Sequence, residues 1–178
     1  MRLHLLRETS CLAIHYDAGN DWLFLDWHGE LTIPHLQEAC VALARCFLLR
    51  PYPRILNSNV QLTGVSWNAA SWLVTEFLPH MTLAGIEHVA WVCAPSLRGR
   101  NMVQTVISWL PGPQLNLFDD TEAAVHWLQH SRPAHAPGHI LPQRPATTQA
   151  ALAQVVQELQ QRVEAQPRKF LRAYPRAA

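Results

Sequence analysis

Closely spaced histidines are the first residues of this sequence whose types and spacing suggest chemistry. His126 and His130 lie four positions apart in a segment that we expect to be helical, so their side chains share one face. Two histidines at this spacing can supply half of a tetrahedral zinc site, and His135 and His139 follow nearby. No cysteine stands at ligand spacing, however, and the HExxH signature is missing. We therefore expect a solvated helix end, and predict neither a metal site nor a cofactor.

The sequence also lacks the common motifs for nucleotide binding and for nucleophilic or acid–base catalysis. It holds no P-loop, no GxGxxG and no nucleophile elbow, and no nucleophile–base or carboxylate pair stands at a recognisable spacing. Ser96 to Arg100 could place an anion at a helix start, although a capped turn is the commoner reading. These observations predict a protein that is not an enzyme.

Composition and charge narrow the class further. The 178 residues are 49% hydrophobic and 15% charged, which is typical of one globular domain with room for an appendage. A formal net charge of +1 gives no global field for a nucleic-acid partner, and no apolar run is long enough for stable membrane insertion. The four cysteines form no CxxC pair, so we expect reduced, buried thiols and a cytoplasmic protein.

Strand-like and helical runs alternate through the first two thirds of the chain. A hairpin is expected over 11–17 and 22–29, with Leu23, Leu25 and Trp27 on its core face. Thr32 and Pro34 then open a helix, and Asp119 resembles the cap of another one. The remaining expected strands are 54–59, 88–94 and 112–118, and the remaining helices begin near Ser66 and cover about 98–110 and 120–130. This order predicts an α/β fold with a mostly parallel sheet of four to five strands, an antiparallel edge hairpin and helices packed on the sheet.

The last third of the chain differs from the rest in composition and in hydrophobic pattern. Residues 1–131 form the predicted α/β domain, and the Pro-rich stretch 132–148 is read as a linker or arm. Residues 149–178 hold an amphipathic helix and a basic tail. The apolar stripe of this helix must pack on the domain, on a second copy in a homodimer, or on a protein partner; it consists of Leu152, Val155, Val156, Leu159 and Val163.

The stretch LTGVSWNAASWL, residues 62–73, reads as a strand end, a Gly-containing turn and a helix that opens on Ser66. The expected apolar stripe of this helix is Trp67, Ala70, Val74, Phe77 and Met81. The seven tryptophans of the chain are explained by core and interface packing, or by an apolar pocket that some of them line.

Several of these runs are similar to one known family. The strand ending ILNSN, Trp72, the FLP at 77–79, AGI at 84–86 and AWV at 90–92 resemble the STAS-like family of anti-anti-sigma factor-like domains. The resemblance extends over about residues 12–128, and it is closest to an uncharacterised Bacteroidetes branch. Because these are mostly packing motifs, they speak for fold more than for chemistry.

In the switch members of that family, a serine at a helix start is phosphorylated by a partner kinase, within an acidic-Ser-Ser-Gly pattern. The resemblance places Ser66 at this position, but the acidic residue and the glycine are missing and Trp67 follows directly. We therefore interpret Ser66 as a helix cap and expect no phosphoserine switch.

The sequence thus predicts a non-enzymatic regulatory or protein-interaction domain of bacterial signalling. The expected contact surface comprises Asn57, Asn59, Ser66 and Trp67, at the carboxyl end of a strand, where open α/β sheets commonly bind. The alternative is a small-molecule or lipid-binding module with a Trp-lined apolar pocket.

Overall fold

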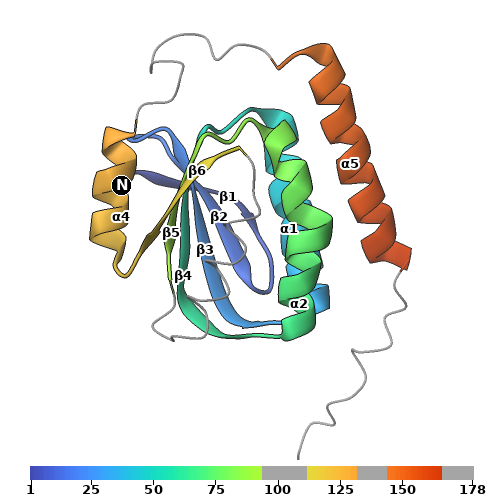
Figure 1. Cartoon of the computed structure of the whole chain (residues 1–178), viewed down its shortest axis with the longest axis horizontal. Helices are drawn as coiled ribbons and strands as arrows, with labels where there is room; N and C mark the ends of the chain where they lie inside the picture. Colours follow the sequence, from blue (N-terminus) through green and yellow to red (C-terminus); the bar gives the residue numbers. More distant parts are fainter. Residues whose placement is uncertain (94–111, 132–143, 166–178) are drawn as a thin grey trace, which may run out of the picture.

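The computed structural model of the chain describes residues 1–93, 112–131 and 144–165 (Figure 1). The predicted helix over 98–110, the Ser96–Arg100 turn, His135, His139 and the basic tail lie outside these residues. Six strands form one sheet in their chain order, from β1 to β6. The strands are β1 (Leu3–Glu8), β2 (Leu12–Asp17), β3 (Trp22–Leu31), β4 (Arg54–Val65), β5 (His88–Val92) and β6 (Gln114–Phe118). The helical segments are α1 (Ile33–Leu49), α2 (Trp67–Trp72), η1 (Leu73–Phe77), η2 (Leu78–Ala84), α4 (Thr121–His130) and α5 (Ala146–Ala165).

The sheet confirms the predicted α/β class and adds a strand. The pairs β1–β2 and β2–β3 are antiparallel, whereas β3–β4, β4–β5 and β5–β6 are parallel. The count of four to five strands was too low, because β1 was not predicted. All six residues of β1 are exposed, so the strand lacks the buried alternation from which strands are recognised.

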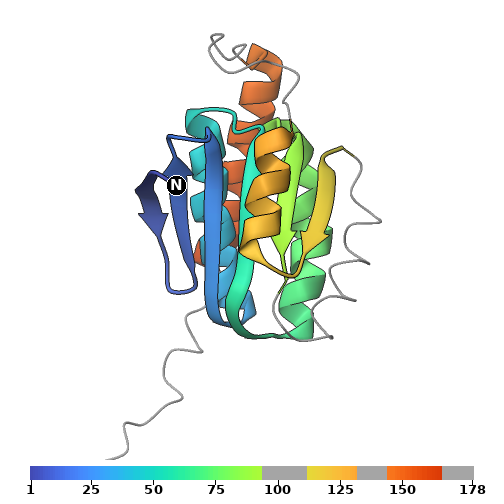
Figure 2. The ribbon, with the colours of Figure 1, turned by 90° about the vertical axis from the view of Figure 1, so that its left-hand side faces the viewer.

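Helices cover both faces of the sheet, and the two cores differ in size. Leu23, Leu25 and Trp27 face α1 in the larger core, as predicted. Trp22 is buried on the opposite face, in a smaller core with Ala124 and Leu128 of α4. Figure 1 shows the layers in the order α4, sheet, α1 with α2, and α5. Figure 2 shows that α4 crosses the later strands and leaves β1 and β2 uncovered on that side.

Local signals explain the ends of the principal helices. Thr32 holds the N-cap position of α1 with a proline in the first turn, but its side chain makes no capping hydrogen bond. The cap of α4 is Asp120 and not Asp119 as predicted, since Asp120 Oδ1 accepts a hydrogen bond of 2.8 Å from Ala123 N. The apolar stripe of α1 is buried throughout: Leu36, Ala39, Cys40, Leu43, Ala44 and Phe47.

The C-terminal helix packs on the same chain, against α1 and η2. Leu152, Val156 and Leu159 are buried, while Val155 and Val163 are partly buried against the same core. This stripe is therefore not free to form the homodimer or partner contact that we considered for it, because its own domain already covers it.

Polar contacts fix α5 at both ends. Arg144 donates to the carbonyls of Phe47 and Ala84 at 3.0 and 2.8 Å, and Gln149 donates to the carbonyl of Leu48 at 3.1 Å. The Phe47 and Leu48 carbonyls belong to the last turn of α1, which has no intrahelical donors and carries partial negative charge. At the other end, Arg162 forms an ion pair of 2.6 Å with Glu76.

Candidate functional site

Strand β4 is the element that carries the predicted site residues, and its two halves differ. Residues 54–59 are all buried, whereas residues 60–65 are exposed or half-buried. The first half lies between β3 and β5, because β5 pairs only with residues 54–58. Beyond that point β3 is the only described strand that pairs with β4, as far as Val65 opposite Leu31.

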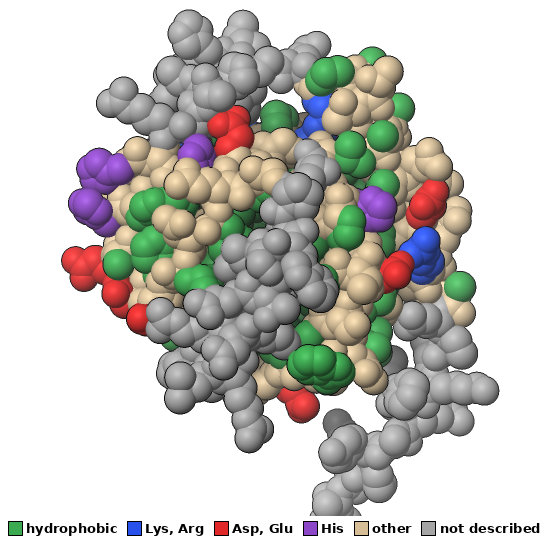
Figure 3. Space-filling model, in the orientation of Figure 1, with side chains coloured by type: hydrophobic (Ala, Val, Ile, Leu, Met, Phe, Trp, Pro, Cys, Tyr) green, Lys and Arg blue, Asp and Glu red, His purple; other side chains and the backbone are tan. Residues whose placement is uncertain are grey.

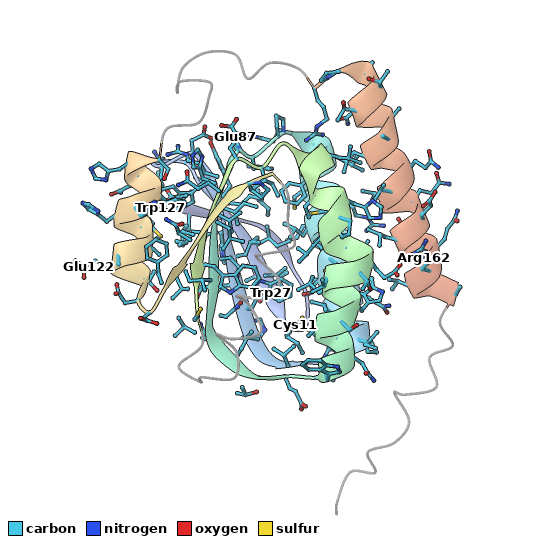
Figure 4. All side chains as sticks on the ribbon, in the orientation of Figure 1. Cys11, Trp27, Glu87, Glu122, Trp127 and Arg162 are labelled. Atoms are coloured by element: carbon cyan, nitrogen blue, oxygen red, sulfur yellow. The ribbon has the colours of Figure 1, made fainter. Side chains whose placement is uncertain are left out.

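A polar network occupies the first half of β4. The indole Nε1 of Trp27 donates to Asn57 Oδ1 at 2.9 Å, and Asn57 Nδ2 donates to Asn59 Oδ1 at 3.3 Å. Asn57 and Asn59 are only 5% and 8% exposed. In Figure 4, Trp27 lies between the sheet and α1. The prediction that Asn57 and Asn59 form a contact surface was therefore wrong. They satisfy hydrogen bonds inside the core, as buried polar groups generally must.

The second half of β4 leads to an exposed apolar surface. Val60 and Val65 are exposed, and the side chain of Trp67, at the start of α2, is 79% exposed. Six strand residues separate Asn59 from Ser66, which places the two about 23 Å apart along the strand. The strand also runs through the predicted turn, since residues 62–65 remain paired with β3. The structure thus does not bring the four predicted residues together.

Ser66 confirms its predicted local role. Its Oγ accepts a hydrogen bond from Ala69 N at 3.3 Å, and its own backbone N–H donates to the carbonyl of Leu31 at 3.0 Å. The first contact is a helix N-cap, and the second ties that cap to the end of β3. The cap therefore holds the exposed Trp67 next to the end of the sheet.

The predicted packing stripe of this helix holds only in part. Ala70, Phe77 and Met81 are buried as expected, but Trp67 is not. Segment η1 has π-helical geometry, in which each turn contains more residues than in an α-helix. The apolar stripe consequently changes phase between Ala70 and Phe77, which a single 3.6-residue period does not reveal.

The cysteines and the paired histidines show no sign of a reactive or metal-binding site. Burial raises the pKa of the Cys11, Cys40 and Cys46 thiols, so they remain protonated and poorly nucleophilic. All four cysteines are buried and none is in a disulfide, as the sequence predicted. The rings of His126 and His130 lie 4.3 Å apart, with His130 Nδ1 2.7 Å from the carbonyl oxygen of His126. Among the described residues, no group of three or more His, Cys, Asp or Glu could hold a metal ion.

The first half of β4 also carries a buried cation. Arg54 donates to the carbonyls of Asn20 and Leu128, and its guanidinium lies 5.7 Å from the Trp22 ring centroid. Its strand neighbour His88 packs edge-on against Trp127, with ring centroids 6.1 Å apart. Burial lowers the pKa of His88, and the nearby Arg54 lowers it further against the opposing effect of Glu87. These groups connect α4 to the sheet and lie away from Trp67.

The tryptophans do not gather around the hollows that the structure describes. One hollow of about 400 Å³ lies between β1, α1 and α5, and another of about 600 Å³ lies between α1, α2, η1 and α5. Among the tryptophans that the structure describes, Trp72 alone lies on their walls. On the face shown in Figure 3, acidic and basic side chains are scattered and form no patch of one sign. None of the helices in the described part of the chain is both long and apolar enough to cross a bilayer.

Comparison with solved structures supports the fold. The crystal structure of an uncharacterized DUF3478-family protein with a SpoIIAA-like fold, from Shewanella loihica PV-4, matches with a TM-score of 0.52 and 19% identity. The match covers 70% of this chain and 99% of that one. Two structures of SiaC from Pseudomonas aeruginosa, one described as apo, match at TM-scores of 0.42 and 0.41 with 13% and 12% identity. They cover 66% of this chain and 98% and 100% of theirs, and at these scores they carry no argument. No family model matches the chain, and no curated protein matches it in sequence.

The chain therefore has a SpoIIAA-like fold, which is the fold of STAS-like domains. The resemblance that the sequence motifs suggested is confirmed at the level of this fold. Its placement in a Bacteroidetes branch stays a prediction.

Proposed function

We propose that this protein is a non-enzymatic regulatory domain that binds a protein partner through the surface formed by Val65, Ser66 and Trp67. We call this set the Trp67 surface. The observation that carries the proposal is the 79% exposure of Trp67 on a short, capped helix. Tryptophan is rarely left in water, and it is enriched among the residues that dominate binding energy at interfaces.

Neighbouring residues support the same proposal. Val65, two residues before Trp67, is also exposed, so Trp67 has a further exposed apolar side chain close to it in the chain. A cluster of exposed apolar side chains marks interaction sites more often than a single one does. The Ser66 cap holds this helix start in place, so binding needs little ordering of the protein.

We further propose that Ser66 acts as a cap and not as a phosphoserine switch. Its oxygen already accepts the Ala69 N–H, and the acidic and glycine residues of the switch pattern are missing from the sequence around it. Mass spectrometry of the protein purified from its native cells would show a phosphate on Ser66 if this proposal is wrong. Residues 1–131 are proposed as the STAS-like unit of a cytoplasmic bacterial protein, with α5 as a helix added to it.

The alternative, a small-molecule or lipid-binding module, has less support. Only Trp72 among the tryptophans lines either of the two hollows described above, and both hollows have polar side chains on their walls. Native mass spectrometry that shows a retained lipid or other ligand would favour this alternative.

A substitution pair tests the proposed surface. Trp67→Ser should remove partner binding while the protein stays folded, because the side chain is exposed. Leu49→Ser is the matched control, since Leu49 is 75% exposed. It lies at the far end of α1, about 24 Å along the helix from its start beside β3. A partner retained by the wild type and by Leu49→Ser, but lost from Trp67→Ser, supports the proposal. Equal retention by all three contradicts it.

A further inference from the structure

One hollow lies beside the Trp67 surface and carries a feature that packing does not explain. It has a volume of about 600 Å³, is open to solvent, and is walled by α1, α2, η1 and the end of α5. Arg162, labelled on α5 in Figure 4, lies on its rim. The volume is within the usual range for binding sites, although the open shape suits a group that enters from a larger partner.

Gln37 forms the inner wall from α1. The residue is only 2% exposed, and its Oε1 has no hydrogen-bond partner. A buried amide oxygen without a donor destabilises a protein, so such groups call for an explanation such as a missing ligand. The oxygen is covered, but Gln37 lines the open hollow, so a rotation of its side chain would present this oxygen to a donor there.

The other walls indicate what kind of donor fits. Thr75 Oγ1 donates its own proton to the Ser71 carbonyl at 3.1 Å, so toward a ligand it can only accept. The Glu76 carboxylate adds a negative charge, and it already forms an ion pair of 2.6 Å with Arg162. The half-buried indole of Trp72 adds an aromatic face, to which organic cations are attracted.

We propose that this hollow binds the guanidinium or ammonium group of a basic segment in a protein partner. The cation donates to Gln37 Oε1, lies against Trp72 and interacts with the Glu76 carboxylate. Ser71 and Trp67 are four residues apart, so the hollow and the Trp67 surface are successive turns of one helical segment. The inference rests on the proposed function in one respect, namely that a protein partner carries the cation.

Small probes test the hollow without knowledge of the partner. The full-length, ¹⁵N-labelled protein is titrated with N-acetyl-arginine methylamide, N-acetyl-lysine methylamide and the neutral, arginine-shaped N-acetyl-citrulline methylamide. At least one cationic probe should shift the Trp72 indole N–H and the Gln37 side-chain amide signals, with an affinity at least tenfold above that of citrulline. Equal affinity for citrulline, or shifts confined to other parts of the protein, would overturn the proposal.

Substitutions then separate a binding role for Gln37 from a structural one. Gln37→Leu removes the unpartnered oxygen and keeps a side chain of similar size. It should therefore weaken binding of the cationic probe about tenfold, while the unfolding midpoint stays the same or rises. Gln154→Leu on the exposed side of α5 is the control and should leave binding unchanged. A Gln37→Leu protein that binds as tightly as wild type contradicts the proposal. If Gln37→Leu loses both stability and binding, Glu76→Gln decides, because it should weaken cation binding without touching the core. Unchanged binding by Glu76→Gln would then contradict the proposal.

The two proposals fail separately. Trp67→Ser should abolish partner binding but leave probe affinity unchanged. A failed probe titration overturns the cation site and leaves the Trp67 surface standing, whereas a partner that tolerates Trp67→Ser overturns the surface alone.

Discussion

The two halves of β4 belong to one continuous strand, yet one half is buried and the other is largely exposed. Residues 55–58 have β3 on one side and β5 on the other, and residues 54–59 are buried. Residues 60–65 have only β3 beside them among the described strands, and they are exposed or half-buried. The first half holds the sheet and both cores together. The second half carries the exposed valines and ends at the cap that presents Trp67.

The difference shows how neighbours decide the role of a polar residue. Asn57 and Asn59 look like surface residues in the sequence, but β3 and β5 enclose them and Trp27 satisfies the Asn57 oxygen. Val60 and Val65 look like core residues, but no second strand covers them. Four predictions follow from the comparison, in decreasing order of the expected change in stability.

The largest effect is expected for Asn57→Ala in the first half. It removes the acceptor of Trp27 Nε1 and the donor to Asn59 Oδ1, and it leaves both partners buried without a hydrogen bond. We expect a loss of about 3 kcal/mol in the free energy of unfolding, measured with urea. Thr63→Ala, in the exposed second half, should change it by less than about 0.5 kcal/mol. Similar losses for the two variants would remove the distinction between the halves.

A moderate effect is expected at the end of the second half. Ser66→Ala removes the N-cap of α2, which should cost about 1 kcal/mol. Ser66→Asp keeps an oxygen acceptor for the Ala69 N–H and should recover most of that loss. If Ser66→Ala is as stable as wild type in urea denaturation, the cap does not hold the helix start.

A smaller effect is expected from pH. It arises from His88 of β5, which pairs with Arg54 in the first half of β4. Burial lowers the folded-state pKa of His88 below its ordinary value of 6.5. The unfolded chain then binds more protons than the folded one, so stability rises with pH in this range. The contribution is complete above about pH 6.5 and is lost as the pH falls from there through the lowered folded pKa. His88→Phe, which keeps a ring against Trp127, should flatten the fall in urea midpoint between about pH 7 and 5. An unchanged slope would show that His88 is not the group responsible.

The smallest effect on stability is expected for Trp67→Ser. The side chain is 79% exposed, so its loss should change the free energy of unfolding by less than about 0.5 kcal/mol. A loss of about 2 kcal/mol or more would instead mean that the indole packs on the protein. The second half of β4 would then be part of the core, contrary to the comparison.

Much of the architecture could be predicted because its signals are local. The hairpin, the buried stripe of α1, the strand at 114–118 and the amphipathic α5 follow from periodicity and from turn or proline residues. Strand β1 was missed because an exposed edge strand has no core-facing alternation. The end of β4 was misplaced because Gly64 resembles a turn, whereas in the structure it pairs with Glu30 of β3.

The site was less predictable because it depends on distant contacts. The acceptor of the Trp27 indole lies 30 residues away, so no local pattern assigns Asn57 to the core. Trp67 is exposed although Ala70, three residues later in the same helix, is buried, so a fixed period placed Trp67 wrongly in the packing stripe. The Ser66 cap, by contrast, could be predicted, since a serine at a strand–helix junction is a local signal.

Site-specific photo-crosslinking tests the central claim most directly. A benzoylphenylalanine is placed at position 67 in one protein and at position 49 in a second, because both positions are highly exposed. Position 67 starts α2, next to a residue bonded to Leu31 just before α1, whereas position 49 is the last residue of α1. After irradiation in the native cells, we predict a discrete crosslinked protein from position 67 that is missing from position 49. The same adduct from both positions, or none from position 67, would contradict the assignment of the Trp67 surface.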